Sequence, residues 1–361
     1  MWVSGTQQIC MIFAGVFLMY LAIVKNFEPN LLLSMGFGTI LANIPASSAI
    51  GEGGALTLLF NMGISNELFP LLIFISVGAM CDFAPLISNP LMFFFGLAAQ
   101  VGIFITMGLA YVLGFNIHEA ASIGIIGAAD GPTAIYVANR FAQNLVPQIS
   151  VAAYTYMAMV PIIQPPVIKL MTTSSERAMR MSYVERPVSR ATLLIFPIAV
   201  TAIAGLIAPA SVALIGFLMF GNLLRVSGVT DRLSKAAQNE LANIITIMLG
   251  LAVSAKMTGP EFANLTTLAI IGMGLFAFVF DTVGGVLSAK LLNMFLPAGR
   301  RVNPMIGAAG ISAFPMASRV IQRMGQEANP GNYLLMHAVG ANIAGQIGSV
   351  IAGGLLLAWL G

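Results

Sequence analysis

Residues 126–133 read Ile-Gly-Ala-Ala-Asp-Gly-Pro-Thr, so an acidic residue, Asp130, lies inside an otherwise apolar stretch. Gly131 and Pro132 directly after it interrupt a helix and free backbone carbonyl groups beside the carboxylate. A carboxylate at membrane depth is costly unless it faces the protein interior, a water-filled cavity or a cation. Oxygen ligands of this kind suit hard cations. The sequence therefore predicts a broken or re-entrant helix over 119–139 that carries a cation site.

The composition of the chain is that of an integral membrane protein. Apolar residues make up 58% and charged residues 8% of its 361 residues, and its mean hydropathy is +0.92, whereas soluble proteins carry about 25% charged residues. The apolar runs approach the ~20 residues that a spanning helix needs, which favours helices over the short strands of a barrel. We predict an all-α membrane protein with about ten spanning helices. The expected spans are 9–24, 31–49, 67–81, 91–114, 149–170, 191–208, 211–226, 241–257, 263–292 and 333–358.

Two general conclusions follow from the same composition. The net charge of +3 is small, so nucleic acid is not an expected partner. No soluble domain of useful size fits between the apolar runs, so any soluble catalytic machinery must belong to another chain.

The second half of the chain repeats motifs of the first half. Ile-Gly-Ala-Ala at 126–129 recurs at 306–309, where it lies in a second apolar but broken segment, 303–323. The further matches keep the same order, at offsets of about 173 to 180 residues: Gly36-Phe37 with Gly216-Phe217, Asn66-Glu67-Leu68 with Asn239-Glu240-Leu241, and Ala138-Asn139-Arg140 with Ala317-Ser318-Arg319. Paired broken segments in two halves are typical of an ion site in a membrane transporter. We therefore expect two transporter-like repeats.

The relative orientation of the repeats depends on the broken segments. If they do not cross the membrane, equivalent spans are five crossings apart and the second repeat is inverted; if they cross, the repeats are parallel. We favour inversion, because it places two half-helix ends at the membrane midplane. The expected divisions are an N-terminal spanning helix (1–30), a first repeat (31–170), a basic linker with a connector helix (171–210) and a second repeat (211–361).

The linker contains the most polar interval of the chain, 169–190, with five basic and two acidic residues. Cytoplasmic loops carry an excess of Lys and Arg, so we expect this loop on the cytoplasmic side.

Asp130 has two interpretations. It could bind a cation together with Thr133 and neighbouring carbonyl groups, or it could only cap the broken helix through backbone N–H groups. Charge at this depth is usually functional, which favours the cation site.

The second broken segment lacks an acid where the first has Asp130. It offers neutral oxygens from Asn303 and Ser312 and one cation, Arg319. Arginine binds carboxylates through two parallel hydrogen bonds, so Arg319 could hold an anionic substrate or pair with Asp130. The alternatives are helix capping by Asn303 before Pro304 and interfacial anchoring by Arg319.

Further candidates stand alone in apolar runs. Tyr154 and Tyr156 could be interfacial residues or proton donors near Asp130. Asp82 is a secondary candidate at the end of a span. Asp281 could be a second ion ligand or one half of a structural pair with Lys290.

Five motifs resemble, in the same order, those of the membrane-embedded beta subunit of the sodium-pumping, biotin-dependent decarboxylases. That family includes oxaloacetate, methylmalonyl-CoA, glutaconyl-CoA and malonate decarboxylases, and the likeness runs from residue 36 to 354. The motifs are Gly-Ala-Ala-Asp-Gly-Pro-Thr (127–133), Phe-Gly-Asn-Leu-Leu-Arg (220–225), Ala-Ala-Gln-Asn-Glu-Leu (236–241), the segment 303–319, and His-Ala-Val-Gly-Ala-Asn (337–342).

The resemblance implies an activity and partners. The subunit would release carbon dioxide from carboxybiotin, export sodium with the free energy gained, and consume a proton. The partners implied are a carboxyltransferase (alpha) subunit, a biotin carrier domain or subunit and a small single-helix (gamma or delta) subunit, in an oligomer of the bacterial cytoplasmic membrane. The compact chain favours an acyl-CoA decarboxylase complex.

The resemblance also assigns residues. The family's important positions fall on Asp130, Tyr156, Asn303, Gly307, Ser312 and Arg319. Asp130 would bind sodium, Tyr156 would handle an ion or proton, and Arg319 would meet carboxybiotin. The residues themselves leave one alternative open, a sodium-coupled secondary carrier that holds an organic anion at Arg319.

Overall fold

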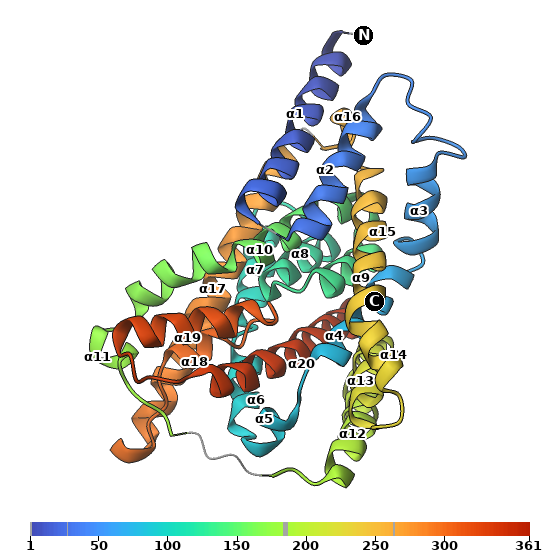
Figure 1. Ribbon diagram of the computed structural model, residues 1–361. Coiled ribbons are helices and arrows are strands. Elements are labelled where there is room, and N and C mark those ends of the chain that lie inside the picture. The colour runs from blue at the N-terminus through green and yellow to red at the C-terminus, as the bar shows by residue number, and fades with distance from the viewer. Residues whose placement is uncertain (1, 27, 183–186, 263) are drawn as a thin grey trace.

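The computed structural model describes residues 2–26, 28–182, 187–262 and 264–361, and all regular structure within these ranges is helical (Figure 1). The elements are α1 (Trp2–Lys25), α2 (Pro29–Asn43), α3 (Ala55–Gly63), α4 (Leu68–Met80), α5 (Ala84–Ser88), α6 (Leu91–Ala98), α7 (Val101–Val112), α8 (Ile117–Gly124), η1 (Ile125–Ala128), α9 (Gly131–Phe141), η2 (Gln143–Leu145), α10 (Val146–Met171), α11 (Ser174–Arg177), α12 (Arg190–Ile207), η3 (Pro209–Ser211), α13 (Val212–Val226), α14 (Asp231–Ala236), η4 (Ala237–Leu241), α15 (Ala242–Ser254), α16 (Gly259–Phe262), α17 (Leu265–Phe295), η5 (Ala298–Arg300), α18 (Met305–Ala308), α19 (Met316–Ala328) and α20 (Leu335–Leu360). The predicted all-α class is confirmed. Residues 183–186 of the predicted linker lie outside the described ranges.

The number of spanning helices differs from the prediction. Among the described residues, eight helices are long and apolar enough to cross a membrane, or nine if α3 and α4, which meet at 65°, form one span. The predicted number of about ten is not confirmed. The predicted span 31–49 ends early, at Asn43, because Pro45 disfavours helical geometry in the residue before it. The predicted span 91–114 is present as one of these spans, Leu91–Val112, which consists of α6 and α7.

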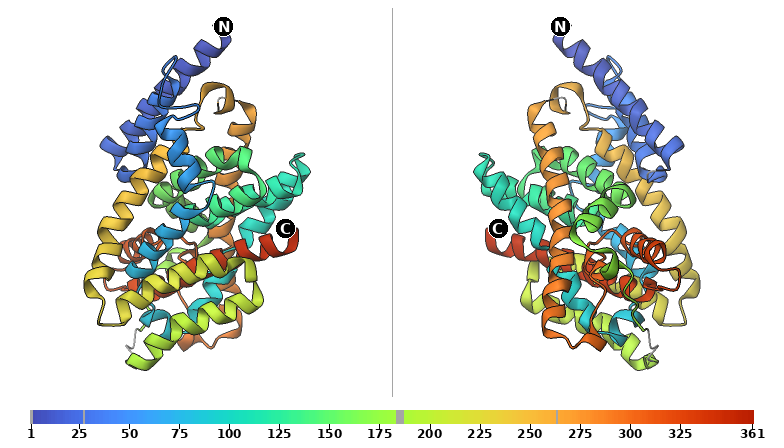
Figure 2. Two further views of the ribbon diagram at one scale, coloured as in Figure 1. Left: turned by 90° about the vertical axis from the view of Figure 1, so that its right-hand side faces the viewer. Right: turned by 90° about the vertical axis from the view of Figure 1, so that its left-hand side faces the viewer.

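The helices form two groups. The outer group is α1 to α4 with α12 to α15, and the inner group is α6 to α10 with α17 to α20. Burial distinguishes them: 67% of the most apolar window is buried in α10 and in α20, against 22% in α1 and 11% in α12. Figure 2 shows α1 and α12 at opposite ends of the molecule. The inner group is therefore the place where a buried site can form.

Packing between the two halves is reciprocal. α2 packs against α15 and α13 packs against α4, while α10 packs against α17 and α20 packs against α6. These pairs are counterparts if the second half repeats the first. Side chains follow the same pattern, since Asn43 Nδ2 donates to the Met257 carbonyl at 2.7 Å and Asn222 Nδ2 donates to the Cys81 carbonyl at 3.1 Å. This packing supports duplication, while inversion and the domain boundaries stay predictions.

The place of α12 bears on the counting of repeats. α12 packs against α13 as α1 packs against α2. This packing favours α12 as the counterpart of α1, whereas the sequence predicted an unpaired connector helix over 191–208.

Candidate functional site

The predicted break in 119–139 is present, between η1 and α9. Ala129 adopts the left-handed conformation, with φ of 52°, which costs on the order of 1–2 kcal/mol for a residue with a Cβ atom. Asp130 follows with extended backbone, directly before α9, and is 4% exposed. Pro132 lies in the first turn of α9, where its missing N–H has no partner to lose. The chain thus holds a buried carboxylate at the start of a half-helix.

Three donors reach this carboxylate. Thr133 Oγ1 and Ser349 Oγ donate to Asp130 Oδ2 at 2.6 and 2.7 Å, and the Thr133 N–H donates to Oδ1 at 3.3 Å. An ionised carboxylate accepts about four hydrogen bonds, and no Lys or Arg in the described ranges forms an ion pair with Asp130. Asp130 therefore caps α9 and still has unused ligand capacity on Oδ1.

The second break lies between α18 and α19 and touches the first. The Ser312 N–H donates to the Ala128 carbonyl at 3.0 Å, and the Ser312 hydroxyl donates to the backbone of α20 at 2.7 Å. Gln346 of α20 donates to the Ser312 carbonyl. Since α20 also supplies Ser349, one helix connects both breaks. The structure thereby brings Ser312 and Asp130, which are far apart in the sequence, to the same region.

Amide side chains from two helices and from the turn between α6 and α7 satisfy the carbonyl groups of the second break. Gln164 of α10 donates to Ala308 at 2.7 Å, Gln100 to Gly310 at 3.3 Å, and Asn342 of α20 to Ile311 at 2.6 Å, beside the bond from Gln346 to Ser312. Buried carbonyl groups outside a helix need such partners. The side-chain oxygens of Gln100, Gln164 and Asn342 are buried and accept no hydrogen bond within the described residues. Neutral oxygens of this kind suit hard cations.

These amide residues and Ser349 were not predicted from the sequence as part of the site. A signal was available for α20, because Asn342, Gln346 and Ser349 are four and three residues apart and therefore lie on one face of an apolar helix. Polar side chains on one face of a spanning helix usually bond to other helices. The positions of Gln100 and Gln164 carry no comparable periodic signal.

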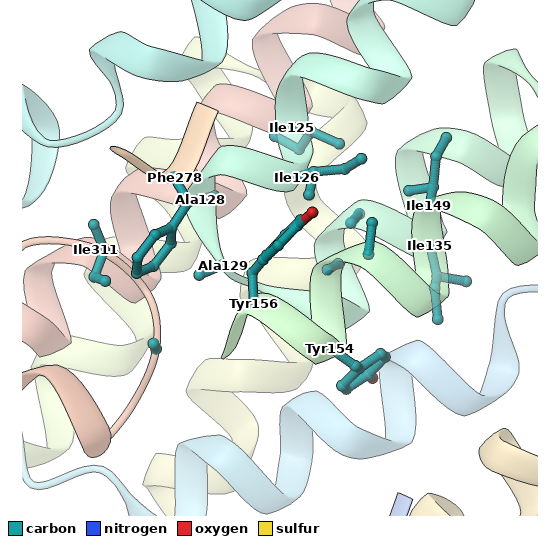
Figure 3. Packing of buried hydrophobic residues seen from close by; sticks show 14 of the residues in the cluster. Ile125, Ile126, Ala128, Ala129, Ile135, Ile149, Tyr154, Tyr156, Phe278 and Ile311 are labelled. Atoms are coloured by element: carbon teal, nitrogen blue, oxygen red, sulfur yellow. The ribbon is translucent and has the colours of Figure 1, made fainter. Parts of the chain in front are cut away.

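Tyr154 and Tyr156 point to different sides of α10 (Figure 3). The Tyr156 hydroxyl donates to the Ile271 carbonyl of α17, and the ring lies near Ile126 in Figure 3. Tyr154 instead covers Gly131, the neighbour of the buried carboxylate, where an added Cβ would be 2.3 Å from a ring carbon. The Tyr154 hydroxyl is buried without a hydrogen-bond partner in the described ranges. Tyr154 is therefore the better placed of the two for a role at the carboxylate.

Asn303 and Gly307 make structural contacts. The Asn303 amide donates to the Arg177 and Met179 carbonyls at 3.1 and 2.9 Å, which fixes the loop after α10 to the start of α18. Gly307 touches α17 so closely that an added Cβ would be 1.8 Å from the Gly285 carbonyl oxygen. Their role as ion ligands stays a prediction.

Arg319 lies apart from the carboxylate. Its side chain is exposed on the first turns of α19 and forms no ion pair within the described ranges. The structure does not pair it with Asp130. It is available to an anion from outside the chain.

Comparison with known proteins identifies the family. The family model described as "Na+-transporting oxaloacetate decarboxylase beta subunit" matches residues 7–360. The chain belongs to this family. It is 51% identical to the methylmalonyl-CoA decarboxylase subunit beta of Veillonella parvula, over 98% of this chain and 94% of the relative. It is 50% identical to the glutaconyl-CoA decarboxylase subunit beta of Acidaminococcus fermentans (97% and 92%) and 41% identical to the oxaloacetate decarboxylase beta chain of Klebsiella pneumoniae (99% and 96%).

The predicted activity class is thereby confirmed. This beta subunit is a multi-pass membrane subunit of a sodium-transporting decarboxylase. Membership in this family favours the pump over the independent secondary carrier.

Two secondary acidic candidates lie elsewhere in the beta subunit. Asp82 forms a partly exposed pair with Arg225, at 3.4 Å, between the ends of outer helices. Asp281 is buried and accepts the Gly102 N–H at 2.5 Å, at the start of α7. The proposed pair of Asp281 with Lys290 is absent, because Lys290 binds a carboxylate of the loop after α10.

Asp281 also lies against Gly127, in the helical turn η1 that precedes the first break. An added Cβ on Gly127 would be 2.6 Å from Asp281 Oδ2, which accepts no hydrogen bond within the described residues. Its first role in the structure is to hold the N-terminus of α7, where a helix dipole favours negative charge.

Proposed function

We propose that the transported sodium ion binds where the two breaks meet, with Asp130 as its charged ligand. The observation that carries this proposal is the buried carboxylate, which has no cationic partner among the described residues and has an under-used Oδ1. Sodium is a hard cation, and carboxylate, hydroxyl and carbonyl oxygens are its natural ligands. Thr133 and Ser312 supply hydroxyl oxygens in the same region. Their hydroxyl groups can turn their lone pairs toward the ion while their protons keep the acceptors described above.

We propose further that Arg319 receives the carboxylate of carboxybiotin, presented by a carrier domain of another chain. An exposed guanidinium without an internal partner suits a bidentate contact with a carboxylate. α19 leads from Arg319 toward Asn329, which donates to the backbone of the basic loop after α10 at 3.3 Å. That loop is the one expected on the cytoplasmic side, where a soluble carrier would approach.

The coupled reaction removes the carboxylate that Arg319 would bind. The N–CO₂⁻ group of carboxybiotin loses carbon dioxide, and the nitrogen takes up one proton to become N–H. The anion at Arg319 is thereby removed. A ligand shifts a two-state equilibrium only through its different affinity for the two states. We propose that carboxybiotin favours the state in which Asp130 faces the cytoplasm, and that its decarboxylation releases the chain to the state facing the other side.

The substrate of the whole complex is proposed from the relatives. The relatives at 51% and 50% identity are named for acyl-CoA decarboxylases, against 41% for the oxaloacetate enzyme. We propose an acyl-CoA substrate, a carboxyltransferase and biotin carrier as partners with a small single-helix subunit, and the bacterial cytoplasmic membrane as location. The exposed apolar faces of α1 and α12 leave room for a membrane-embedded partner.

The test uses the assembled complex in sodium-loaded and sodium-free liposomes. Asp130→Asn keeps the side chain's shape but removes its charge, so sodium transport and sodium-dependent carbon dioxide release should both fall by about 30-fold or more, since a buried charged contact is worth about 2–5 kcal/mol. Asp231→Asn, at an exposed position of α14, serves as the control and should behave as wild type. Full coupled activity of the Asp130→Asn variant would exclude the proposed site.

A further inference from the structure

The end of α9 is locked to the turn between α3 and α4. Arg140 makes a two-pronged ion pair with Glu67, with Nε to Oε1 at 2.5 Å and Nη2 to Oε2 at 3.0 Å. Asn139 Nδ2 donates to the Ser65 carbonyl at 3.0 Å. The Glu67 side chain is 10% exposed and the Arg140 side chain is 57% exposed, so the Glu67 end of this pair is shielded from solvent. The lock holds one broken segment of the inner group against an outer helix.

The corresponding residues of the second half are not paired. The repeat matches Arg140 with Arg319 and Glu67 with Glu240. Both Arg319 and Glu240 are exposed, and neither forms an ion pair or hydrogen bond through its side chain within the described ranges. The helices differ in the same way: α9 packs against α4, but no comparable packing joins α19 to α15. Packing inside the inner group and inside the outer group is therefore alike in the two halves of the chain. The ion pair that joins the two groups is formed in the first half and not by the described residues of the second.

The backbone at Glu240 differs from its counterpart in one informative respect. Between α3 and α4 the chain is broken at residues 64–67, with a bend of 65°. At the matching place the second half continues as a helix through a π-helical turn, η4, that contains Glu240. Such π-turns are often found at functional sites and at helix bends. The second half thus keeps an irregular turn where the first half has its lock.

We propose that Glu240 is the partner of Arg319 in the second conformation of this subunit, as Glu67 is the partner of Arg140 in this one. In transporters built from repeats, alternating access is largely a movement of one group of helices against the other. When the inner group moves, α9 would leave α4, and α19 would approach η4 and α15. One lock opens as the other closes. This inference rests on the two-state pump proposed above and assigns Glu240 a positioning role in it.

The same geometry gives carboxybiotin a competitor. Arg319 can bind the carboxylate of carboxybiotin or that of Glu240, but its single guanidinium fork cannot hold both in two-pronged geometry. Carboxybiotin at Arg319 keeps the second lock open, and loss of carbon dioxide frees Arg319 for Glu240. Decarboxylation would then replace the carboxylate of carboxybiotin at Arg319 with the carboxylate of Glu240.

Crosslinking tests the pair without any ligand. In the full chain in membranes, Glu240→Cys with Arg319→Cys should be joined by a short bifunctional thiol reagent. Adding Glu67→Gln weakens the first lock and should raise the yield by about two- to five-fold, in proportion to the worth of one ion pair. Glu240→Cys with Arg323→Cys, about one helical turn further along α19, is the matched control and should not respond. The proposal is overturned if the 240–319 pair links no better than this control in either background.

Two precautions make this result decisive. The native thiols, Cys10 and Cys81, are first replaced by Ser and Ala. The pair Glu67→Cys with Arg140→Cys in that background must link readily, because these side chains are in contact in the structure. Its linking shows that the background without Cys10 and Cys81 folds and that the reagent reaches this interface, and an unchanged Tm of the purified 240–319 variant shows that this chain has folded as well.

Kinetics of the assembled complex separate the two proposals. Glu240→Gln removes the competitor, so the KM for the carboxylated carrier should fall about two- to five-fold while kcat for sodium export also falls. A residue with only a structural role would not lower KM. Responsive crosslinking with an unchanged KM would uphold the Glu240–Arg319 pair and refute carboxybiotin binding at Arg319. A KM that rises in Glu240→Gln would refute the competition.

Discussion

The contact between Gly307 and α17 provides the sharpest structural prediction. An added Cβ on Gly307 would be 1.8 Å from the Gly285 carbonyl oxygen and 2.5 Å from the Gly285 carbonyl carbon. Both atoms belong to the backbone of a long helix, so neither can rotate away. Reaching an ordinary contact of 3.4 Å requires a displacement of about 1.6 Å. Gly307→Ala must therefore push α18 away from α17 or fail to fold normally.

The displacement has two measurable consequences. Overpacking of this kind costs about 1–3 kcal/mol, so we expect the Tm of the purified subunit to fall by about 2–6 °C. α18 leads directly into the carbonyl groups that receive the amide side chains, so the second break would move with it. A misplacement near 1 Å can reduce a rate by about 100-fold. Sodium-dependent carbon dioxide release of the complex should fall by about 10- to 100-fold.

Gly272→Ala is the matched control. Gly272 lies on α17, the helix that Gly307 of α18 touches, but no atom lies within 4 Å of its added Cβ. Alanine is a better helix former than glycine by about 1 kcal/mol, so Tm should stay constant or rise, with normal sodium dependence. Wild-type Tm and activity in Gly307→Ala would refute the packing argument. A wild-type Tm with a changed sodium affinity would instead identify Gly307 as an ion ligand.

Three further predictions concern the site and its surroundings. Thr133→Val removes a hydroxyl donor to Asp130, and we expect sodium affinity to fall by about 5- to 30-fold in a sodium titration of carbon dioxide release, with Thr133→Ser near wild type. Gln164→Leu leaves the Ala308 carbonyl without its partner and should cost about 1–3 kcal/mol of stability, measured as Tm; an unchanged Tm would mean that water replaces the amide. Glu176 is partly buried, which by itself raises its pKa, but hydrogen bonds from the Thr173 backbone and from a lysine of α17 leave its pKa below the ordinary value. The charge of Glu176, and with it the bond to α17, is therefore complete at neutral pH and is lost only as acidification takes the pH through this lowered pKa, so proteolysis of the loop after α10 should rise in acid in wild type and already at neutral pH in Glu176→Gln.

The first break could be predicted because its signal is local. An acid followed by Gly and Pro within an apolar run leaves few structural alternatives, and Asp130 lies where that pattern places it. Thr133 was found for the same reason, since it is three residues away. Ser349 also donates to this carboxylate but is 219 residues from Asp130 in the sequence. Only the packing of α20 brings it there, and no local pattern contains that information.

The two tyrosines show a second limit. Tyr154 and Tyr156 are two residues apart on α10, so they point to nearly opposite sides of the helix. The sequence alone offered both tyrosines and the resemblance favoured Tyr156, yet Tyr154 is the one that covers Gly131. The direction of a helix face depends on how the helix packs, and α10 is buried over most of its length. A helix with no polar face gives the sequence no means to choose.

The unequal chemistry of the two breaks fits the proposed binding of one sodium ion at Asp130. The first break has one carboxylate, Asp130, and the second has neutral amide and hydroxyl oxygens around Ser312. A second acid at the junction would repel the first and raise its pKa, whereas one carboxylate and one sodium ion form a neutral pair. Burying an unpaired charge is expensive, and burying a neutral pair costs much less. The energy barrier to movement of the inner helices is then lower with the ion bound than without it. A pump requires this difference, because it keeps the unoccupied, charged site from moving across the membrane. A chain with two such breaks has this property when only one of them carries an acid, as in this subunit.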